Sequence, residues 1–182
     1  MRGFCRFVLA AGLLSLPAVA RSQSFHVNGL DGMTQTVKQE GQSAITGLAL
    51  RARIGSDDLP VHVTIMPTLE YWRDTAHLQD FNIRSTQKDL ALGVDARYDL
   101  SLGSWRPYMG AGIAAHFIKT SFAAPDIGIA PSEQGHTKVG PNALIGLQLA
   151  PLGFLQSFIE AKYAYVPPFR QFKFDWGLGV NF

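Results

Sequence analysis

Hydrophobic and polar residues alternate with a period of two along most of this chain. The alternation is sharpest in residues 172–182, where the odd positions are polar or glycine and the even ones are all hydrophobic: Phe172, Phe174, Trp176, Leu178, Val180 and Phe182. Successive side chains of a β-strand point to opposite faces, so this segment is predicted to form a strand with one apolar and one polar face. Such a strand is typical of a barrel wall that separates lipid from a polar interior.

The same alternation predicts six further strands, which cover residues 44–54, 61–71, 89–99, 105–117, 139–149 and 159–165. Bacterial single-chain barrels have an even number of strands, so an eighth strand is required before the first of these. We assign it to Ser24–Lys38, where Phe25 and Val27 begin an alternation that Gly29 and Gly32 weaken. The alternative is that this segment forms a periplasmic or lumen-plugging arm.

The predicted fold class is therefore all-β, an eight-stranded antiparallel up-and-down transmembrane β-barrel. The turns at 55–60, 101–104 and 151–153 are short, whereas the connections at 73–85 and 120–137 are long. In this architecture short turns face the periplasm and long loops face the exterior, and the predicted strand directions agree with that rule. Pro67 cannot donate a backbone hydrogen bond to a neighbouring strand, so a β-bulge is predicted at this residue.

Aromatic residues stand where the two membrane interfaces of such a barrel would lie. They are Tyr71, Tyr163, Tyr165 and Phe172 at the outer interface, and Tyr98, Trp105 and Phe182 at the inner one. The main rival fold is a soluble lipocalin-like barrel, whose apolar face would point inward around a ligand. The aromatic belts and the terminal Phe182 favour the membrane barrel.

Two segments carry a resemblance to known proteins. The ending Asp175-Trp-Gly177-Leu-Gly-Val180-Asn-Phe182 resembles the assembly signal of bacterial outer-membrane barrels. The segment that begins Pro107-Tyr and continues with glycine at alternate positions resembles a strand of the small barrels of the OmpX, OmpW and opacity-protein type. The resemblance implies recognition of Asp175, Gly177, Val180 and Phe182 by the barrel assembly machinery, and a passive structural or surface-interaction role.

The amino terminus has the layout of a secretory signal peptide. Arg2 and Arg6 precede an apolar run over residues 7–16, and Ala18-Val-Ala20 forms a small-residue cleavage site, as export signals do. We therefore divide the chain into a signal peptide, residues 1–20, and a barrel domain, residues 21–182. The only cysteine, Cys5, lies in the signal, so the exported domain is expected to hold no disulfide.

Composition narrows the possible partners. Hydrophobic residues make up 47% of the chain and charged residues 16%, yet after the signal no apolar run reaches the ~18 residues of a transmembrane helix. The net charge of +2 and the lack of a basic run argue against nucleic acid as a partner. The expected surroundings of a monomeric barrel are outer-membrane lipid and lipopolysaccharide.

Charged residues collect on the face that would line the lumen. They are Arg51, Arg53, Glu70, Asp95, Arg97, Asp99, Glu160, Lys162, Lys173 and Asp175. The interior of an eight-stranded barrel is only wide enough for side chains to fill, and buried charges require partners. We therefore expect a plug of ion pairs; the alternative is a narrow porin-like path for small solutes.

A lipid A-modifying enzyme is the second alternative. His116 and Ser121, with Glu70 as the acid, are the candidates for a catalytic group. The histidine pattern associated with the lipid A deacylases is absent, since Phe117 follows His116 directly, and His116 is expected to be a lumen or rim residue hydrogen-bonded to a neighbour. The other histidines lack metal-ligand spacing, so no catalytic residue, metal or cofactor is assigned.

Overall fold

The computed structural model describes residues 25–40, 43–56, 62–78, 83–100, 105–127, 129–149, 154–167 and 169–182. The predicted signal peptide, residues 1–20, lies outside these ranges. The described residues form eight strands and a short 3-10 helix, in the order β1 (Phe25–Gln39), β2 (Ile45–Ser56), β3 (Val63–Leu78), β4 (Ile83–Asp99), β5 (Arg106–Ala124), η2 (Pro125–Ile127), β6 (Ile129–Gln148), β7 (Leu155–Val166) and β8 (Phe169–Asn181). No helix in these ranges is long and apolar enough to cross a membrane.

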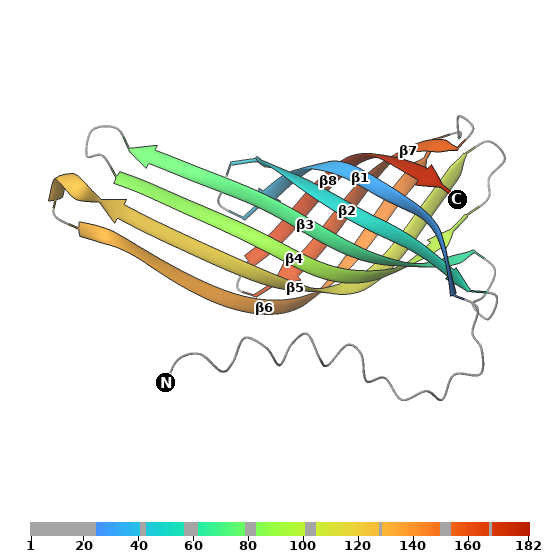
Figure 1. The fold of residues 1–182 in the computed structure, drawn as a ribbon, viewed down its shortest axis with the longest axis horizontal. Helices are drawn as coiled ribbons and strands as arrows, with labels where there is room; N and C mark the ends of the chain where they lie inside the picture. The colour runs from blue at the N-terminus through green and yellow to red at the C-terminus, as the bar shows by residue number, and fades with distance from the viewer. Residues whose placement is uncertain are drawn as a thin grey trace.

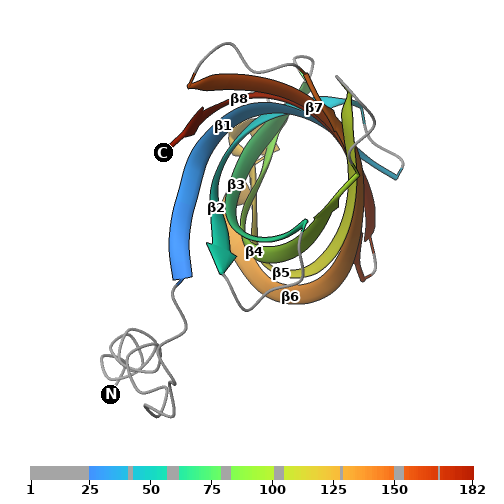
Figure 2. The same cartoon turned by 90° about the vertical axis from the view of Figure 1, so that its right-hand side faces the viewer.

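Each strand pairs antiparallel with the next, and β8 pairs with β1, so the sheet closes into a barrel (Figure 2). The predicted fold class is confirmed in strand number, direction and closure. Closure leaves no unpaired edge in the part of the wall that all eight strands share. We call the end where β1 begins and β8 ends the lower end, and the opposite end the upper end. The lower end is at the right of Figure 1 and the upper end at the left.

The first strand is a full member of the wall, so the alternative of a plugging arm is wrong. Leu30 pairs with Ala52 of β2 on one side and with Val180 of β8 on the other. Gly29, one of the two glycines that weaken the sequence pattern, is required by packing, because a Cβ there would overlap the Val180 carbonyl oxygen and the guanidinium of Arg53. A bulge follows Val27, where the register of β1 against β2 shifts.

The bulge predicted at Pro67 is wrong. Pro67 pairs with Val94 of β4 in a register that does not shift along the strand. On the other side the β2–β3 pairing passes from Arg51 opposite Thr68 to Ile54 opposite Ile65, again without a change of register. The missing donor of proline is therefore accommodated by a local gap in one ladder, and the strand needs no extra residue.

The described parts of the long loops predicted at 73–85 and 120–137 are instead strand extensions, apart from the short helix η2. Strands β3, β4, β5 and β6 continue far beyond β1, β2, β7 and β8 and form a protruding sheet at the upper end (Figure 1). In this sheet the side chains of residues 129–139 are exposed on both faces. Alternation marks a strand only where one face is buried, which explains why the sequence pattern missed these extensions.

The two faces of the barrel wall differ sharply in polarity. Ile113 and Ile145 on the outside are 62% and 64% exposed, whereas Asp95 and Lys162 on the inside are 0% and 2% exposed. The lipocalin-like alternative requires the opposite arrangement and is wrong. The apolar outer face extends around the barrel and includes Leu30, Leu48, Leu50, Leu92, Val94, Tyr163, Phe172, Trp176 and Leu178.

Glycines on the two faces should respond differently to substitution. A Cβ at inward Gly177 would overlap the ring of Phe158, which is buried and lies under the Arg51 guanidinium. A Cβ at outward Gly32 would meet only Leu50 Cδ2, at 3.9 Å. We expect Gly177→Ala to lower the free energy of unfolding by ~1–3 kcal/mol through overpacking, and Gly32→Ala to leave it unchanged or slightly higher. Urea unfolding of the folded barrels measures both, and equal stability of the two variants would contradict the packing found around Phe158.

Candidate functional site in the barrel lumen

Strand alternation brings the predicted charged residues into one interior. Among the ten residues predicted to form the lumen network, Asp99 lies at the rim and is partly exposed. The others are buried and come from five strands: Arg51, Arg53, Glu70, Asp95, Arg97, Glu160, Lys162, Lys173 and Asp175. Burial of so many charges is tolerated only where partners compensate them, so their contacts decide what the lumen can do.

Arg51 of β2 is the centre of the lower group of ion pairs. Its Nη1 lies 2.8 Å from Glu160 Oε2 of β7, and its Nε lies 3.1 Å from Asp31 Oδ2 of β1. The Tyr108 hydroxyl also donates to Glu160 Oε2, at 2.9 Å. Arg53 Nε contacts the second oxygen of Asp31 at 3.0 Å. Side chains from four strands are thus tied together across the lumen.

Lys162 of β7 is the centre of a second group. Its Nζ lies 2.9 Å from Glu70 Oε1 and 2.8 Å from Asp95 Oδ2. Lys173 stands directly opposite Lys162 in the β7–β8 register and pairs with the other oxygen of Glu70. Two neighbouring ammonium groups would repel each other, and the shared carboxylate of Glu70 compensates both.

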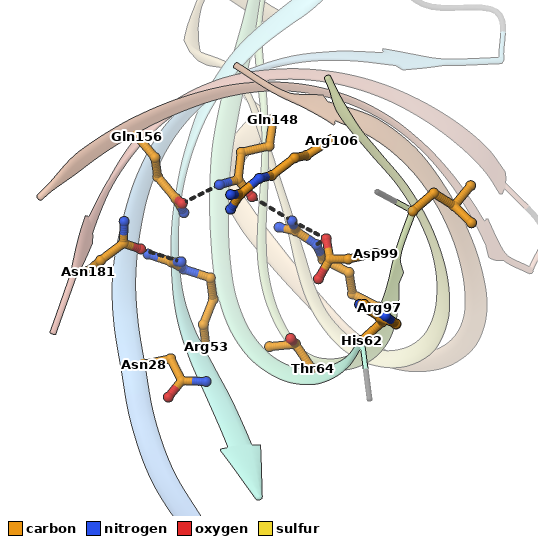
Figure 3. Close-up of a pocket in the computed structure, with 11 residues that line it drawn as sticks. Asn28, Arg53, His62, Thr64, Arg97, Asp99, Arg106, Gln148, Gln156 and Asn181 are labelled. Carbon is orange, nitrogen blue, oxygen red and sulfur yellow. Dashed lines mark hydrogen bonds and ion pairs between the residues drawn. The ribbon is translucent and has the colours of Figure 1, made fainter. Parts of the chain in front are cut away.

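Polar side chains also line a cavity of about 340 Å³ at the lower mouth of the barrel (Figure 3). Arg97 pairs with Asp99, and its Nη2 donates to Gln148 Oε1 at 2.7 Å. The Arg97 guanidinium also lies over the Tyr108 ring, 3.8 Å from the centroid. Arg53 donates to Asn181 Oδ1 at 2.7 Å. Arg53 and Arg97, two of the cations that line the cavity, are thus already paired.

His116 lies in the upper half of the lumen, where it contacts Asp89 rather than the residues of a catalytic triad. Its Nδ1 is 2.8 Å from Asp89 Oδ2, and Gln171 lies near the same oxygen. Ser121 is an odd number of positions from His116 along β5, so the two side chains point to opposite faces. Glu70 is occupied by the two lysines. The structure does not bring the three candidate catalytic residues together.

Hydrophobic side chains fill the lumen between the polar groups, and the sequence analysis missed them. They form four clusters: Met33, Ala49 and Phe158; Val37, Ile45 and Trp72; Met66, Tyr108 and Leu144; and Ile118, Ala164 and Val166. All of them occupy inward positions of their strands, so the alternation itself was the signal that could have identified them. Asp31 was missed for a related reason, because the first strand was the weakest pattern.

The residues of the predicted assembly signal lie on both faces of β8. Val180 and Phe182 are exposed on the outside, whereas Gly177 and Asp175 face the lumen. Asp175 is buried opposite Glu160 in the strand register. Among the described residues it forms no ion pair, unlike the other predicted lumen charges.

Comparison with known proteins finds the same fold in solved structures. No family model and no curated protein matches the chain. Neisserial surface protein A shares 18% identity over 87% of this chain and 97% of its own, with a TM-score of 0.58. The Yersinia pestis attachment invasion locus protein, Ail, solved with the heparin analogue sucrose octasulfate, shares 13% identity over 87% and 98%, with a TM-score of 0.60. A major outer membrane protein of Thermus thermophilus shares 11% identity over 86% and 100%, with a TM-score of 0.65.

The chain therefore has the fold of the small eight-stranded outer-membrane β-barrels. The similarity covers nearly the whole length of each of these proteins. At these identities the likeness concerns the fold, and function must be argued from the chain's own residues.

Two glutamates provide a matched test of the lumen network. Glu160 pairs with Arg51 in the interior, whereas Glu133 pairs with Lys119 at a site where both side chains are more than half exposed. Glu160→Ala leaves a buried cation short of a partner, at a cost that reaches ~3–5 kcal/mol where no water enters. Glu133→Ala should cost ~0–1 kcal/mol, as exposed ion pairs do. Denaturant unfolding of both variants checks this, and similar losses would mean that the lumen is solvated.

Proposed function

We propose that the protein is a monomeric bacterial outer-membrane β-barrel with a structural or surface-interaction role, whose lumen is closed by its own side chains. The observation that carries this proposal is the combination of an apolar outer wall with an interior of buried ion pairs and hydrophobic clusters. On β3, β4 and β5 the apolar outward positions run over residues 63–71, 90–98 and 109–117. Each run matches the ~9–11 residues that a tilted strand needs to cross a bilayer.

The two ends of the barrel suggest its orientation. The lower end carries the carboxyl terminus of β8, and the upper end carries the protruding sheet of β3–β6 (Figure 1). Outer-membrane barrels place their short turns in the periplasm and their larger extensions outside the cell. We therefore place the protruding sheet at the cell surface, and a cleaved signal peptide, residues 1–20, accounts for export.

The protruding sheet is the part of the chain best suited to contact other molecules. The pairs of β6 with β7 run only from Asn142 to Gln148, whereas its pairs with β5 continue to Ile129. The outer part of β6 thus forms an edge strand, which carries Pro131 and a charged residue, Glu133, as edges that resist aggregation do. Ail carries the name attachment invasion locus protein, and its structure holds a heparin analogue. This likeness supports a surface-interaction role for the chain.

The carboxyl-terminal residues fit the proposed route into the membrane. Val180 and Phe182 lie exposed at the lower end of the apolar wall, where the insertion machinery could read them. We propose that Asp175 contributes a polar side chain to the lumen face of the same strand, and that Gly177 contributes by having no side chain there.

The orientation of the two faces can be tested with arginine. Val94 is half exposed on the outer wall, and Gln148 is 7% exposed in the lumen. Val94→Arg should lower the free energy of unfolding in lipid vesicles by ~2–4 kcal/mol, the penalty for a cation on the lipid face near the bilayer centre. Gln148→Arg avoids that transfer penalty, although it also places a second guanidinium beside Arg97, which donates to Gln148. Tolerance of Val94→Arg without the expected loss would argue against the membrane barrel.

A conductance measurement separates the structural role from the porin-like alternative. Because ion pairs and hydrophobic clusters fill the lumen, the purified protein in a planar bilayer should show no steady conductance. Regular, ion-selective steps would instead establish the channel.

The enzyme alternative needs its own assay, in which the same preparation is incubated with lipopolysaccharide and the mass of lipid A is measured. A change in acyl chains that disappears in His116→Ala would make the protein an enzyme.

A further inference from the structure

Three adjacent strands end their apolar outward run in the same way. On β3 the outward position after Tyr71 is Arg73. On β4, which runs in the opposite direction, the outward position above Leu90 is Lys88, and on β5 Lys119 follows Phe117. Each strand therefore carries a cation one outward position above the top of its apolar run. We call Arg73, Lys88 and Lys119 the basic row.

The register makes these cations direct neighbours. Arg73 pairs with Lys88 across β3 and β4, and Lys88 pairs with Lys119 across β4 and β5. Side chains directly opposite each other on one face of a sheet have Cβ atoms about 4.5–5.5 Å apart. The residues beside them in sequence, Trp72 and Asp89, are buried in the lumen, so the basic row points outward.

Within the described residues the basic row is poorly compensated. Arg73 and Lys88 form no ion pair there, and Lys119 has a single exposed partner, Glu133, at 3.0 Å. Like charges directly opposite each other destabilise a sheet. Inside the lumen the chain handles the same problem with Glu70, which compensates Lys162 and Lys173. On the outer wall the described residues leave the remaining charge open to a partner of opposite charge.

We propose that the basic row binds the phosphate groups of lipid A, whose acyl chains lie against Tyr71, Leu90 and Phe117 just below it. The proposal rests on the proposed outer-membrane location and surface orientation, and it names a site for lipopolysaccharide on β3–β5. The row stands at the upper end of the apolar run, which is the height of the headgroup phosphates. Arg73 offers a guanidinium that grips phosphate through two hydrogen bonds, and the lysines supply mobile point charges.

The site can be tested with a matched pair of triple variants. One variant replaces the row, R73Q/K88Q/K119Q. The control, R84Q/R106Q/K138Q, removes three exposed cations that do not stand one outward position above an apolar run. Binding is measured with the purified protein folded in phosphatidylcholine vesicles that contain lipid A. The row variant should lose roughly 100-fold in affinity for lipid A, since each cation near an anionic surface contributes about 1 kcal/mol, and the control should lose much less. Equal losses in the two variants would reduce the effect to net charge and overturn the site.

Two further vesicle compositions identify the ligand. Dephosphorylated lipid A should bind the unmodified protein as weakly as lipid A binds the row variant, because the row recognises phosphate. If phosphatidylglycerol binds as tightly as lipid A, the row is a general contact for anionic lipid and the assignment to lipid A is wrong.

The central lysine gives a second test that does not depend on a triple variant folding well. Lys88→Gln removes the charge that is next to both Arg73 and Lys119. It should raise the stability of the barrel in pure phosphatidylcholine, where it relieves repulsion, and lower it when lipid A is present. Loss of stability in both lipids, or in neither, would contradict the proposal. If the unmodified protein fails to insert into vesicles at all, the proposal of a membrane barrel is wrong. If it inserts, and Lys88→Gln changes the stability of the barrel in the same direction in both lipids, only the proposed lipid A site is wrong.

Discussion

Closure of eight strands leaves an interior only wide enough for side chains, and the rest of the structure depends on this limit. A charge placed inside must find its partner across a few ångströms, because little water can enter to solvate it. The result is visible around Arg51, which reaches carboxylates on β1 and β7, and around Lys162, which reaches carboxylates on β3 and β4. Arg51 and Asp31 lie on adjacent strands, whereas the other three contacts link strands that are not neighbours in the sheet.

The same narrowness explains the distribution of glycine and aromatic residues. Tyr108 and Phe158 fit inside because Gly146 and Gly177 leave room for their rings, where a Cβ would overlap them. Cations then lie over those rings, Arg97 over Tyr108 and Arg51 over Phe158. Aromatic faces and guanidinium groups attract each other, so the glycines serve the ionic network indirectly. The interior therefore combines buried ion pairs with aromatic rings in one network.

Alternation in the sequence was sufficient to predict the fold, because each strand of the shared wall has one apolar, exposed face and one buried face that lines the lumen. It identified Leu90 to Tyr98 as a strand and placed Asp95 and Arg97 inside. It failed where that asymmetry ends, since residues 129–139 are exposed on both faces. The ion-pair partner of each charge could not be predicted from the sequence either. The contact of Arg51 with Glu160, for example, depends on how β2 faces β7 across the closed barrel. No pattern within a single strand encodes that distance.

The two sides of the wall compensate charge in different ways. Lys162 and Lys173 are as close in register as Arg73 and Lys88, yet the first pair shares Glu70 and the second has no ion-pair partner among the described residues. Inside, the barrel supplies its own counter-ions from neighbouring strands. Outside, in the proposed outer-membrane setting, lipid phosphates would stand at the end of the apolar run. Anionic headgroups would therefore favour a row of cations at this height, which connects the charge pattern of β3–β5 to the surface on which the protein is proposed to lie.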